Sequence, residues 1–163
     1  MPGRLIVKIA LKFVLGLGAV VLLCTPAARA QREKLPPEDL DFVQKNWPEA
    51  KKTSTGIRYI IMREGQGAMP KPGNKVAVLY VFRLLNGTPV DQTVDRDHPF
   101  EFRIRRDMVI EGWDQVLQLM KVGEKRLAII PSELGYGTRG QPPKVPRNAT
   151  LVFEIELLEI KPE

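Results

Sequence analysis

Several short segments of the chain alternate hydrophobic with polar residues. In residues 100–105, the hydrophobic residues Phe100, Phe102 and Ile104 are separated by charged ones. A period of two, or the β-branched composition that is typical of strands, is found in four more segments: residues 57–62, 75–84, 125–130 and 151–157. Such patterns indicate β-strands that bury one face. The sequence therefore predicts five strands.

One segment follows a helical period instead. Its apolar residues are spaced three and four apart, at Trp113, Val116, Leu117 and Met120. This spacing predicts an amphipathic helix of about two turns, with Gly123 as a left-handed cap at its end. A helix that covers the apolar face of the strands makes an α+β fold. We therefore expect a five-stranded antiparallel twisted sheet wrapped around one short helix, in a domain formed by residues 56–163.

Two proline-containing segments flank or interrupt this pattern. Residues 31–55 are polar and contain three prolines, which predicts an N-terminal extension or linker with one short helical turn. Residues 131–150 contain four prolines and predict a long loop before the last strand. Loops of this length inside a compact domain are usually functional.

Residues 1–30 have the composition of a secretory signal peptide. Three basic residues precede an uncharged apolar run at residues 13–23, and small residues follow as far as Ala30. The apolar run is well short of the roughly twenty residues that span a bilayer. We therefore expect an exported protein, periplasmic or secreted, that is cleaved near Ala30 and then has no stable membrane association. An uncleaved membrane anchor is the alternative.

The net charge of +6 mostly reflects this leader. Residues 1–30 hold four of the 25 basic residues and no acidic one, so the remaining residues carry 21 basic and 19 acidic side chains. A surface of such mixed charge argues against nucleic-acid binding. Cys24 is the only cysteine and lies in the leader, so no disulfide and no thiol chemistry are expected after cleavage.

Motifs for cofactor or metal chemistry are weak in this sequence. Residues 135–140 match the glycine pattern of dinucleotide-binding loops, but Pro142 and Pro143 follow and cannot continue the helix that such a loop must open. His98 is the only histidine, which leaves little support for a metal centre or a serine–histidine pair. We expect no cofactor and no metal.

Many short motifs together resemble the FKBP family of peptidyl-prolyl cis-trans isomerases. The resemblance runs from about Thr53 to Ile160, which is the whole predicted domain. It rests on blocks in the same order and spacing: Gly73, Val76-x-Val78-x-Tyr80, Asn86-Gly87, Val90-Asp91, Pro99-Phe100-x-Phe102, Val109-Ile110-x-Gly112-Trp113, Val122-Gly123-Glu124, Gly135-Tyr136-Gly137 and residues 148–154. Collinear agreement of many blocks is more specific than any single block.

This resemblance implies a pocket for a proline ring. The floor would be Trp113, and the walls would come from strand ends and the long loop: Tyr80, Val90, Phe100, Val109, Ile110, Tyr136, Val145 and Phe153. The Ile110 backbone N–H and the Tyr136 hydroxyl would donate hydrogen bonds to the peptide. Asp91 would lie beside the reacting carbonyl group, in a cluster with Tyr80 and Arg96.

The sequence departs from the family pattern at a few positions near this pocket. Val90 stands where the family usually has an aromatic residue, Val81 and Phe82 replace a common Thr-Gly, Met108 replaces an acidic residue, and Gln141 replaces a histidine. From Val90 we expect a pocket that is wider and wetter on that side. The expected consequences are weak affinity for macrolide inhibitors and an improvement when Val90 is replaced by phenylalanine.

Two functions are compatible with these residues. The first is isomerisation of X-Pro bonds in proline-containing, unfolded or partly folded polypeptides. The second is a prolyl-binding holdase or assembly module without much catalysis. Acidic and hydroxyl groups at positions 91 and 136 favour the isomerase, since a purely apolar groove has little use for them. No dimerisation helix is predicted before the domain, so we expect a monomer.

Overall fold

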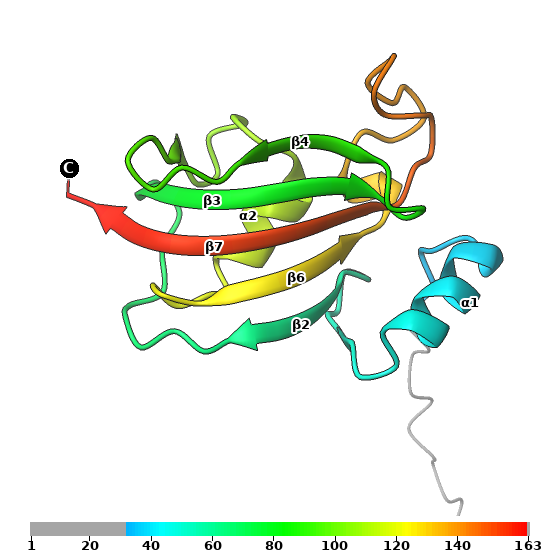
Figure 1. Ribbon diagram of the computed structural model, residues 1–163, viewed down its shortest axis with the longest axis horizontal. Helices are drawn as coiled ribbons and strands as arrows, with labels where there is room; N and C mark the ends of the chain where they lie inside the picture. Colours follow the sequence, from blue (N-terminus) through cyan, green and yellow to red (C-terminus); the bar gives the residue numbers. More distant parts are fainter. Residues whose placement is uncertain (1–31, 163) are drawn as a thin grey trace, which may run out of the picture. The chain divides into compact units, whose positions relative to one another are not determined.

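The computed structural model describes residues 32–162, and the predicted leader lies outside this range. A single antiparallel sheet is accompanied by two α-helices and a 3-10 turn (Figure 1). The elements are, in chain order, α1 (Pro37–Asn46), β1 (Lys51–Lys52), β2 (Arg58–Arg63), β3 (Lys75–Leu84), β4 (Pro89–Thr93), β5 (Phe100–Arg103), α2 (Glu111–Leu117), β6 (Lys125–Ile130), η1 (Ser132–Leu134) and β7 (Leu151–Lys161).

The sheet contains all five predicted strands and two more. Its strand order is β1-β2-β6-β7-β3-β4, and β5 also pairs with β3. β5 pairs with residues 75–78 of β3 and β4 with residues 80–83, so two short strands share one edge of the sheet. Sequence analysis missed β4 because its residues are mostly exposed and show no alternation. The predicted α+β architecture is confirmed.

The main core lies between the sheet and α2. Trp113, Val116 and Leu117 from α2 are buried against the inward-facing side chains of the strands, which include Val76, Val78, Phe153, Ile155 and Leu157. Glycine is required at the start of α2, because a Cβ at Gly112 would lie 2.5 Å from Cγ2 of Ile130 on β6. The close approach of helix and sheet therefore depends on the sequence Gly112-Trp113.

The end of this helix differs from the prediction. α2 ends at Leu117, so Met120 is buried in the core from the connection that follows the helix. Gly123 has the predicted positive φ of 87°, but it lies in the turn before β6 and its N–H donates to Leu157 O. Gly123 is therefore not the helix cap. After Leu117 the chain continues in tighter turns, in which the Leu119 N–H donates to Val116 O and the Met120 N–H to Leu117 O, so the regular helix ends before the amphipathic pattern does.

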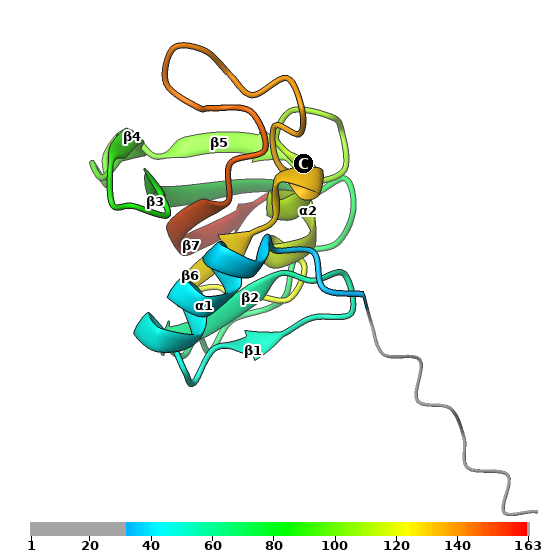
Figure 2. The same ribbon diagram turned by 90° about the vertical axis from the view of Figure 1, so that its right-hand side faces the viewer.

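A second cluster lies on the opposite face of the sheet. Leu127 and Ile129 of β6 and Val152 of β7 belong to this cluster and alternate along their strands with residues of the main core. Its other buried members come from α1 and the segment before it, and α1 lies beside the C-terminal end of β6 (Figures 1 and 2). Val43 of α1 is 1% exposed and Leu35 is also buried.

No helix in the described part of the chain is long and apolar enough to cross a membrane.

The description of residues 31–55 as a linker with one short helical turn is wrong for the described residues. α1 has ten residues, with a proline in its first turn. Glu33 accepts two hydrogen bonds from the guanidinium of Arg58, which hold its pKa well below the ordinary value. Thr150 donates to Asp39 of α1. The sequence pattern was too short to reveal this packing, because the partners of the helix lie far away in the chain.

A substitution in α1 tests whether this segment contributes to stability. Val43→Ala is expected to lower the free energy of unfolding by about 1–3 kcal/mol, because it removes buried methyl groups between helix and sheet. Chemical denaturation measures the change. The control is Gln44→Ala, at an exposed neighbouring position, which should change stability by about 0.5 kcal/mol or less. If the two variants had the same free energy of unfolding, the packing of α1 would not contribute to stability and the segment would act as a linker.

Candidate functional site

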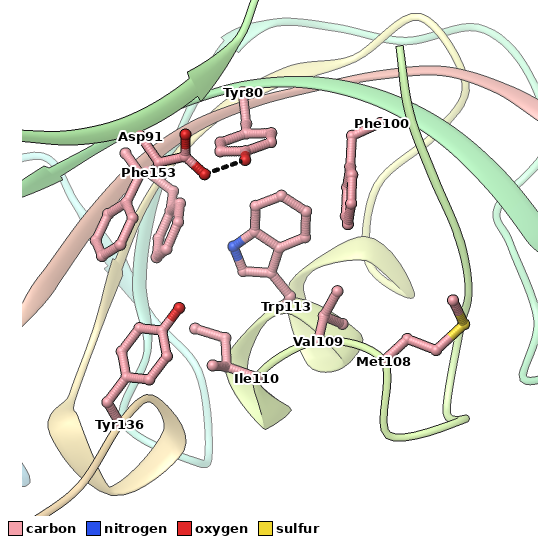
Figure 3. A pocket seen from close by; sticks show the side chains of 10 residues that line it. Tyr80, Asp91, Phe100, Met108, Val109, Ile110, Trp113, Tyr136 and Phe153 are labelled. Atoms are coloured by element: carbon pink, nitrogen blue, oxygen red, sulfur yellow. Dashed lines mark hydrogen bonds between the residues drawn. The ribbon is translucent and has the colours of Figure 1, made fainter. Parts of the chain in front are cut away.

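A cavity of about 240 Å³ opens between the inner face of the sheet and the start of α2 (Figure 3). Its lining residues come from five elements (β3, β4, β5, α2 and β7) and from two connections: Tyr80, Phe82, Asp91, Phe100, Met108, Val109, Ile110, Trp113, Tyr136 and Phe153. We call it the first cavity. Most of its walls are aromatic or aliphatic, and the polar groups are two hydroxyls and one carboxylate.

Trp113 forms the floor of the first cavity. Its side chain is 4% exposed, and three aromatic rings approach it edge to face: Tyr80 at 5.0 Å, Phe153 at 5.4 Å and Phe100 at 6.0 Å between ring centroids. Edge-to-face packing fixes the plane of the indole. The indole Nε1 is buried and has no hydrogen-bond partner among the described residues. The floor is therefore an aromatic ring that is almost fully buried and held in place by its aromatic neighbours.

The connection between β5 and α2 brings three further residues to the cavity. Arg105 and Asp107 both have positive φ, at 58° and 54°, so the backbone turns sharply before Met108. Asp114 is buried and accepts a hydrogen bond from the Arg105 N–H at 2.8 Å, which ties this turn to α2. Met108, Val109 and Ile110 then pass along the rim of the cavity, as Figure 3 shows.

Ile110 lines the same space at the start of α2. It is the residue before the first turn of α2, with extended φ and ψ, and its carbonyl accepts from the Trp113 N–H. The first N–H groups of a helix have no partner inside the helix. The Ile110 N–H therefore has no acceptor within α2.

Tyr80 and Asp91 are held together by one short hydrogen bond. Tyr80 of β3 donates to Oδ2 of Asp91 on β4 at 2.7 Å. The two residues are diagonal neighbours across the strand pair, since Tyr80 lies opposite Thr93 and Asp91 lies opposite Phe82. Burial raises the pKa of Tyr80 to about 12, and the Asp91 carboxylate adds to this rise. At neutral pH the hydroxyl therefore stays protonated and donates to the carboxylate.

Tyr136 comes from the long loop. Its ring is partly buried. Figure 3 shows its hydroxyl directed toward the indole of Trp113, and this hydroxyl forms no hydrogen bond with the other side chains in the figure. Burial and the nearby Asp91 charge raise the pKa of Tyr136. The loop is held by its own backbone hydrogen bonds, including Asn148 N–H to Gly137 O at 2.9 Å. Tyr136 can therefore donate to a ligand from a defined position.

Three of the residues predicted for the pocket lie elsewhere. Val145 is fully buried in the main core, where it attaches the long loop to the domain and does not line the cavity. Arg96 does not join Asp91. It pairs with Glu156 at 2.6 Å, on the face of the sheet opposite the cavity, because Glu156 and the inward-facing Ile155 alternate along β7. Val90 is partly buried but lines a different, neighbouring cavity.

The remaining predicted residues all meet at the first cavity, together with two that sequence analysis did not assign to it. Phe82 and Met108 were noted only as departures from the family pattern. Phe82 is 3% exposed and stacks on Phe153, with ring centroids 4.3 Å apart. Phe82 lies between the first cavity and the space beside Val90, so the expected wider and wetter pocket on that side stays a prediction. The alternation along β3 contained the signal, because it puts Phe82 on the same face as Tyr80.

The first cavity can bind a small apolar ring and shield it from water. Its hydroxyl and carboxylate groups can form hydrogen bonds with polar groups of the ligand next to that ring. It has no nucleophile aligned with a base. Within residues 32–162, no group of three or more histidine, cysteine, aspartate or glutamate side chains is placed to hold a metal ion.

Comparison with known proteins agrees with this geometry. Residues 66–158 match the family model of the FKBP-type peptidyl-prolyl cis-trans isomerases. The chain is 42% identical to FK506-binding protein 1 of Dictyostelium discoideum over 106 residues, which cover 65% of this chain and 99% of that protein. It is also 42% identical to human peptidyl-prolyl cis-trans isomerase FKBP4 over 135 residues, but it spans only 28% of that longer protein.

A solved structure shows the same fold over a similar length. The crystal structure of a peptidyl-prolyl cis-trans isomerase from Pseudomonas syringae superposes with a TM-score of 0.67 at 33% identity, covering 80% of this chain and all of the other. Sequence, fold and the residues around the first cavity thus agree. The chain belongs to the family of FKBP-type peptidyl-prolyl cis-trans isomerases.

Proposed function

We propose that this protein is a peptidyl-prolyl cis-trans isomerase that acts on proline-containing, unfolded or partly folded polypeptides. The observation that carries the proposal is the first cavity, in which an aromatic floor and three hydrogen-bonding groups surround a space for one small ring. The residues we assign to the substrate are Trp113 as the floor, Tyr80, Phe100, Val109 and Phe153 as walls, and Ile110, Tyr136 and Asp91 as polar groups.

The proposed mechanism makes and breaks no covalent bond. Rotation about an X-Pro bond is slow because resonance gives the C–N bond partial double-bond character, with a barrier of about 18–20 kcal/mol. In the twisted transition state this resonance is lost and the amide is less dipolar. An apolar cavity that excludes water favours that state over the planar ground state. Acceleration of about 10⁵-fold would need about 7 kcal/mol of such preference.

The polar groups have separate tasks in this mechanism. The Ile110 N–H and the Tyr136 hydroxyl donate to carbonyl groups of the bound peptide and fix its backbone beside the cavity. Asp91 lies at the edge of the first cavity with its carboxylate oriented by Tyr80. It acts through its charge on the rotating carbonyl group, and no proton transfer is required.

The isomerase assay on the chain from Gln31 onward tests the proposal. Turnover of a proline-containing tetrapeptide from cis to trans, coupled to a protease that cuts only the trans form, should far exceed the uncatalysed rate. An aggregation assay with an unfolded protein is run in parallel. If the protein prevents aggregation but does not accelerate isomerisation, the isomerase proposal is wrong and the holdase function is supported.

Single substitutions at the polar groups should separate catalysis from stability. Tyr136→Phe is expected to lower kcat/KM by about threefold to tenfold and Asp91→Ala by about tenfold to a hundredfold, as hydrogen bonds and charge-assisted contacts of typical strength are lost. Neither should change the free energy of unfolding by more than about 1 kcal/mol. Asp91→Asn distinguishes the charge from the hydrogen bond to Tyr80. Full activity of Asp91→Ala contradicts the electrostatic role.

Gln92→Ala is the matched control for these variants. Gln92 follows Asp91 on β4, is exposed and does not line the first cavity. Its replacement should leave kcat/KM within about twofold of the parent. A similar loss in Gln92→Ala and Asp91→Ala would assign the effect to a disturbed β4 strand.

We also propose an exported location, periplasmic or secreted, because the composition of residues 1–30 is that of a signal peptide. N-terminal sequencing of the exported species should give a start at or near Gln31. A membrane-retained product that still contains residues 13–23 would favour the anchor instead. In the exported compartment we expect a monomer, which gel filtration with light scattering can test.

A further inference from the structure

Two cavities share a wall at the proposed active site, and Phe82 is part of that wall. The first cavity has a volume of about 240 Å³. A second cavity of about 330 Å³ lies next to it, between β4 and the long loop, and is lined by Phe82, Val90, Asp91, Tyr136 and residues 141–144. Phe82, Asp91 and Tyr136 line both. Among these three, Phe82 is the only one that is buried.

The ring of Phe82 is fixed from both sides. It stacks on Phe153 with an interplanar angle of 16° and lies nearly parallel to Tyr136, with ring centroids 6.4 Å apart and an angle of 21°. The strand register puts Phe82 directly between Phe153 on β7 and Asp91 on β4. It thus connects the packed core to the Tyr136 ring. A ring held in this way forms a firm wall.

The neighbouring strand leaves the space for this ring. Val90 lies where the pairing of β3 and β4 shifts register, between Asp91 opposite Phe82 and Pro89 opposite Arg83. It lines the second cavity beside Phe82 but not the first. In this chain, position 90 therefore holds a small residue beside the large ring at position 82. The same space would be filled from β4 if the sizes were exchanged.

We propose that Phe82 is a specificity-determining residue, which closes the first cavity so that it accepts a proline ring and excludes larger ring systems. This inference rests on the proposed isomerase function. Pockets for drug-sized ligands typically have about 300–1,000 Å³. The first cavity lies below this range, whereas the two cavities joined would lie within it. The wall that keeps them apart therefore decides how large a ligand can bind.

Truncation of the ring tests this inference by binding. In Phe82→Ala we expect the affinity for FK506, used as the large probe, to rise about tenfold, which corresponds to about 50 Å² of additional apolar contact. The affinity for a short proline-containing peptide should not rise, because the added space lies beyond its ring. Isothermal titration calorimetry gives both dissociation constants without relying on turnover. The measured quantity is the ratio of the two affinities.

An exchange variant and a core variant are the controls. In the double variant Phe82→Ala/Val90→Phe, we expect the new ring to fill the same space from β4. The ratio of the FK506 and peptide affinities should then return to the parent value, so the effects of the two single substitutions should not add. Leu157→Ala truncates another fully buried residue of the same core cluster that lines neither cavity. It should lower stability without changing the ratio. If Phe82→Ala does not fold, Phe82→Leu replaces it, with an expected change of about threefold.

The outcomes separate this inference from the proposed function. If the parent isomerises the tetrapeptide but a folded Phe82→Ala or Phe82→Leu variant keeps the parent ratio, Phe82 does not set ligand size and the inference is overturned. A change of equal size in Leu157→Ala also overturns it, because general loosening of the core then explains the gain. If the parent shows no turnover, the isomerase function fails, while the ratio still decides the role of Phe82.

Discussion

Trp113→Ala is expected to reduce isomerase turnover to the uncatalysed rate and to lower the free energy of unfolding by about 3–5 kcal/mol. The indole is both the floor of the first cavity and a central part of the core, packed edge to face by Tyr80, Phe100 and Phe153. Its loss leaves a void that a proline ring cannot fill and that admits water beside the reacting amide. Denaturant unfolding and the protease-coupled assay measure the two effects.

Two variants separate these effects. Trp113→Phe keeps an aromatic floor and should retain part of the turnover and most of the stability. Trp47→Phe alters the other tryptophan, which packs in the cluster under α1, and should leave turnover unchanged. A folded Trp113→Ala protein with the kcat/KM of the parent would show that the indole serves packing alone.

Glu124→Ala should lower the free energy of unfolding by about 3–5 kcal/mol, although Glu124 does not line the first cavity. Its carboxylate is almost fully buried and accepts from Nε of Arg126 at 2.6 Å and from the Lys121 N–H at 3.1 Å. Arg126 also donates to Leu119 O and lies 4.5 Å over the Tyr59 ring. Removing the carboxylate leaves a buried guanidinium without its counter-charge, and a buried unpaired charge is costly.

The comparison with other pairs makes this prediction specific. Replacing both partners, as Glu124→Leu/Arg126→Met, should be near neutral, because no buried charge remains. Arg83→Ala breaks the more exposed pair with Glu154 and should cost about 1 kcal/mol or less. Guanidinium chloride denaturation ranks the variants. If Glu124→Ala were as stable as Arg83→Ala, the guanidinium of Arg126 would find enough solvent or backbone acceptors by itself.

Much of the sheet and α2 could be predicted because the patterns involved are local. In residues 100–105 and 75–84, successive side chains point to opposite faces, and the hydrophobic ones recur at every second position. A period of two with one buried face is typical of a β-strand. The same alternation puts Tyr80 and Phe82 on one face. The family resemblance then brought Tyr80, Asp91, Trp113 and Tyr136 together, and in the structure these four residues do line one cavity.

What the sequence could not decide depends on contacts between distant segments. Packing of Leu35 and Val43 against β6 and β7 stabilises α1, whose own pattern is weak. Arg96 lies in the connection between β4 and β5, and it pairs with Glu156 of β7 and not with Asp91. Its partner therefore depends on how this connection folds over the sheet, which no local pattern reveals. Val145 is buried because loop closure brings it to the core. Whether Phe82 or Val90 fills the space beside Asp91 depends on where β3, β4 and β7 pair, so only the tertiary structure determines the shape of the cavity.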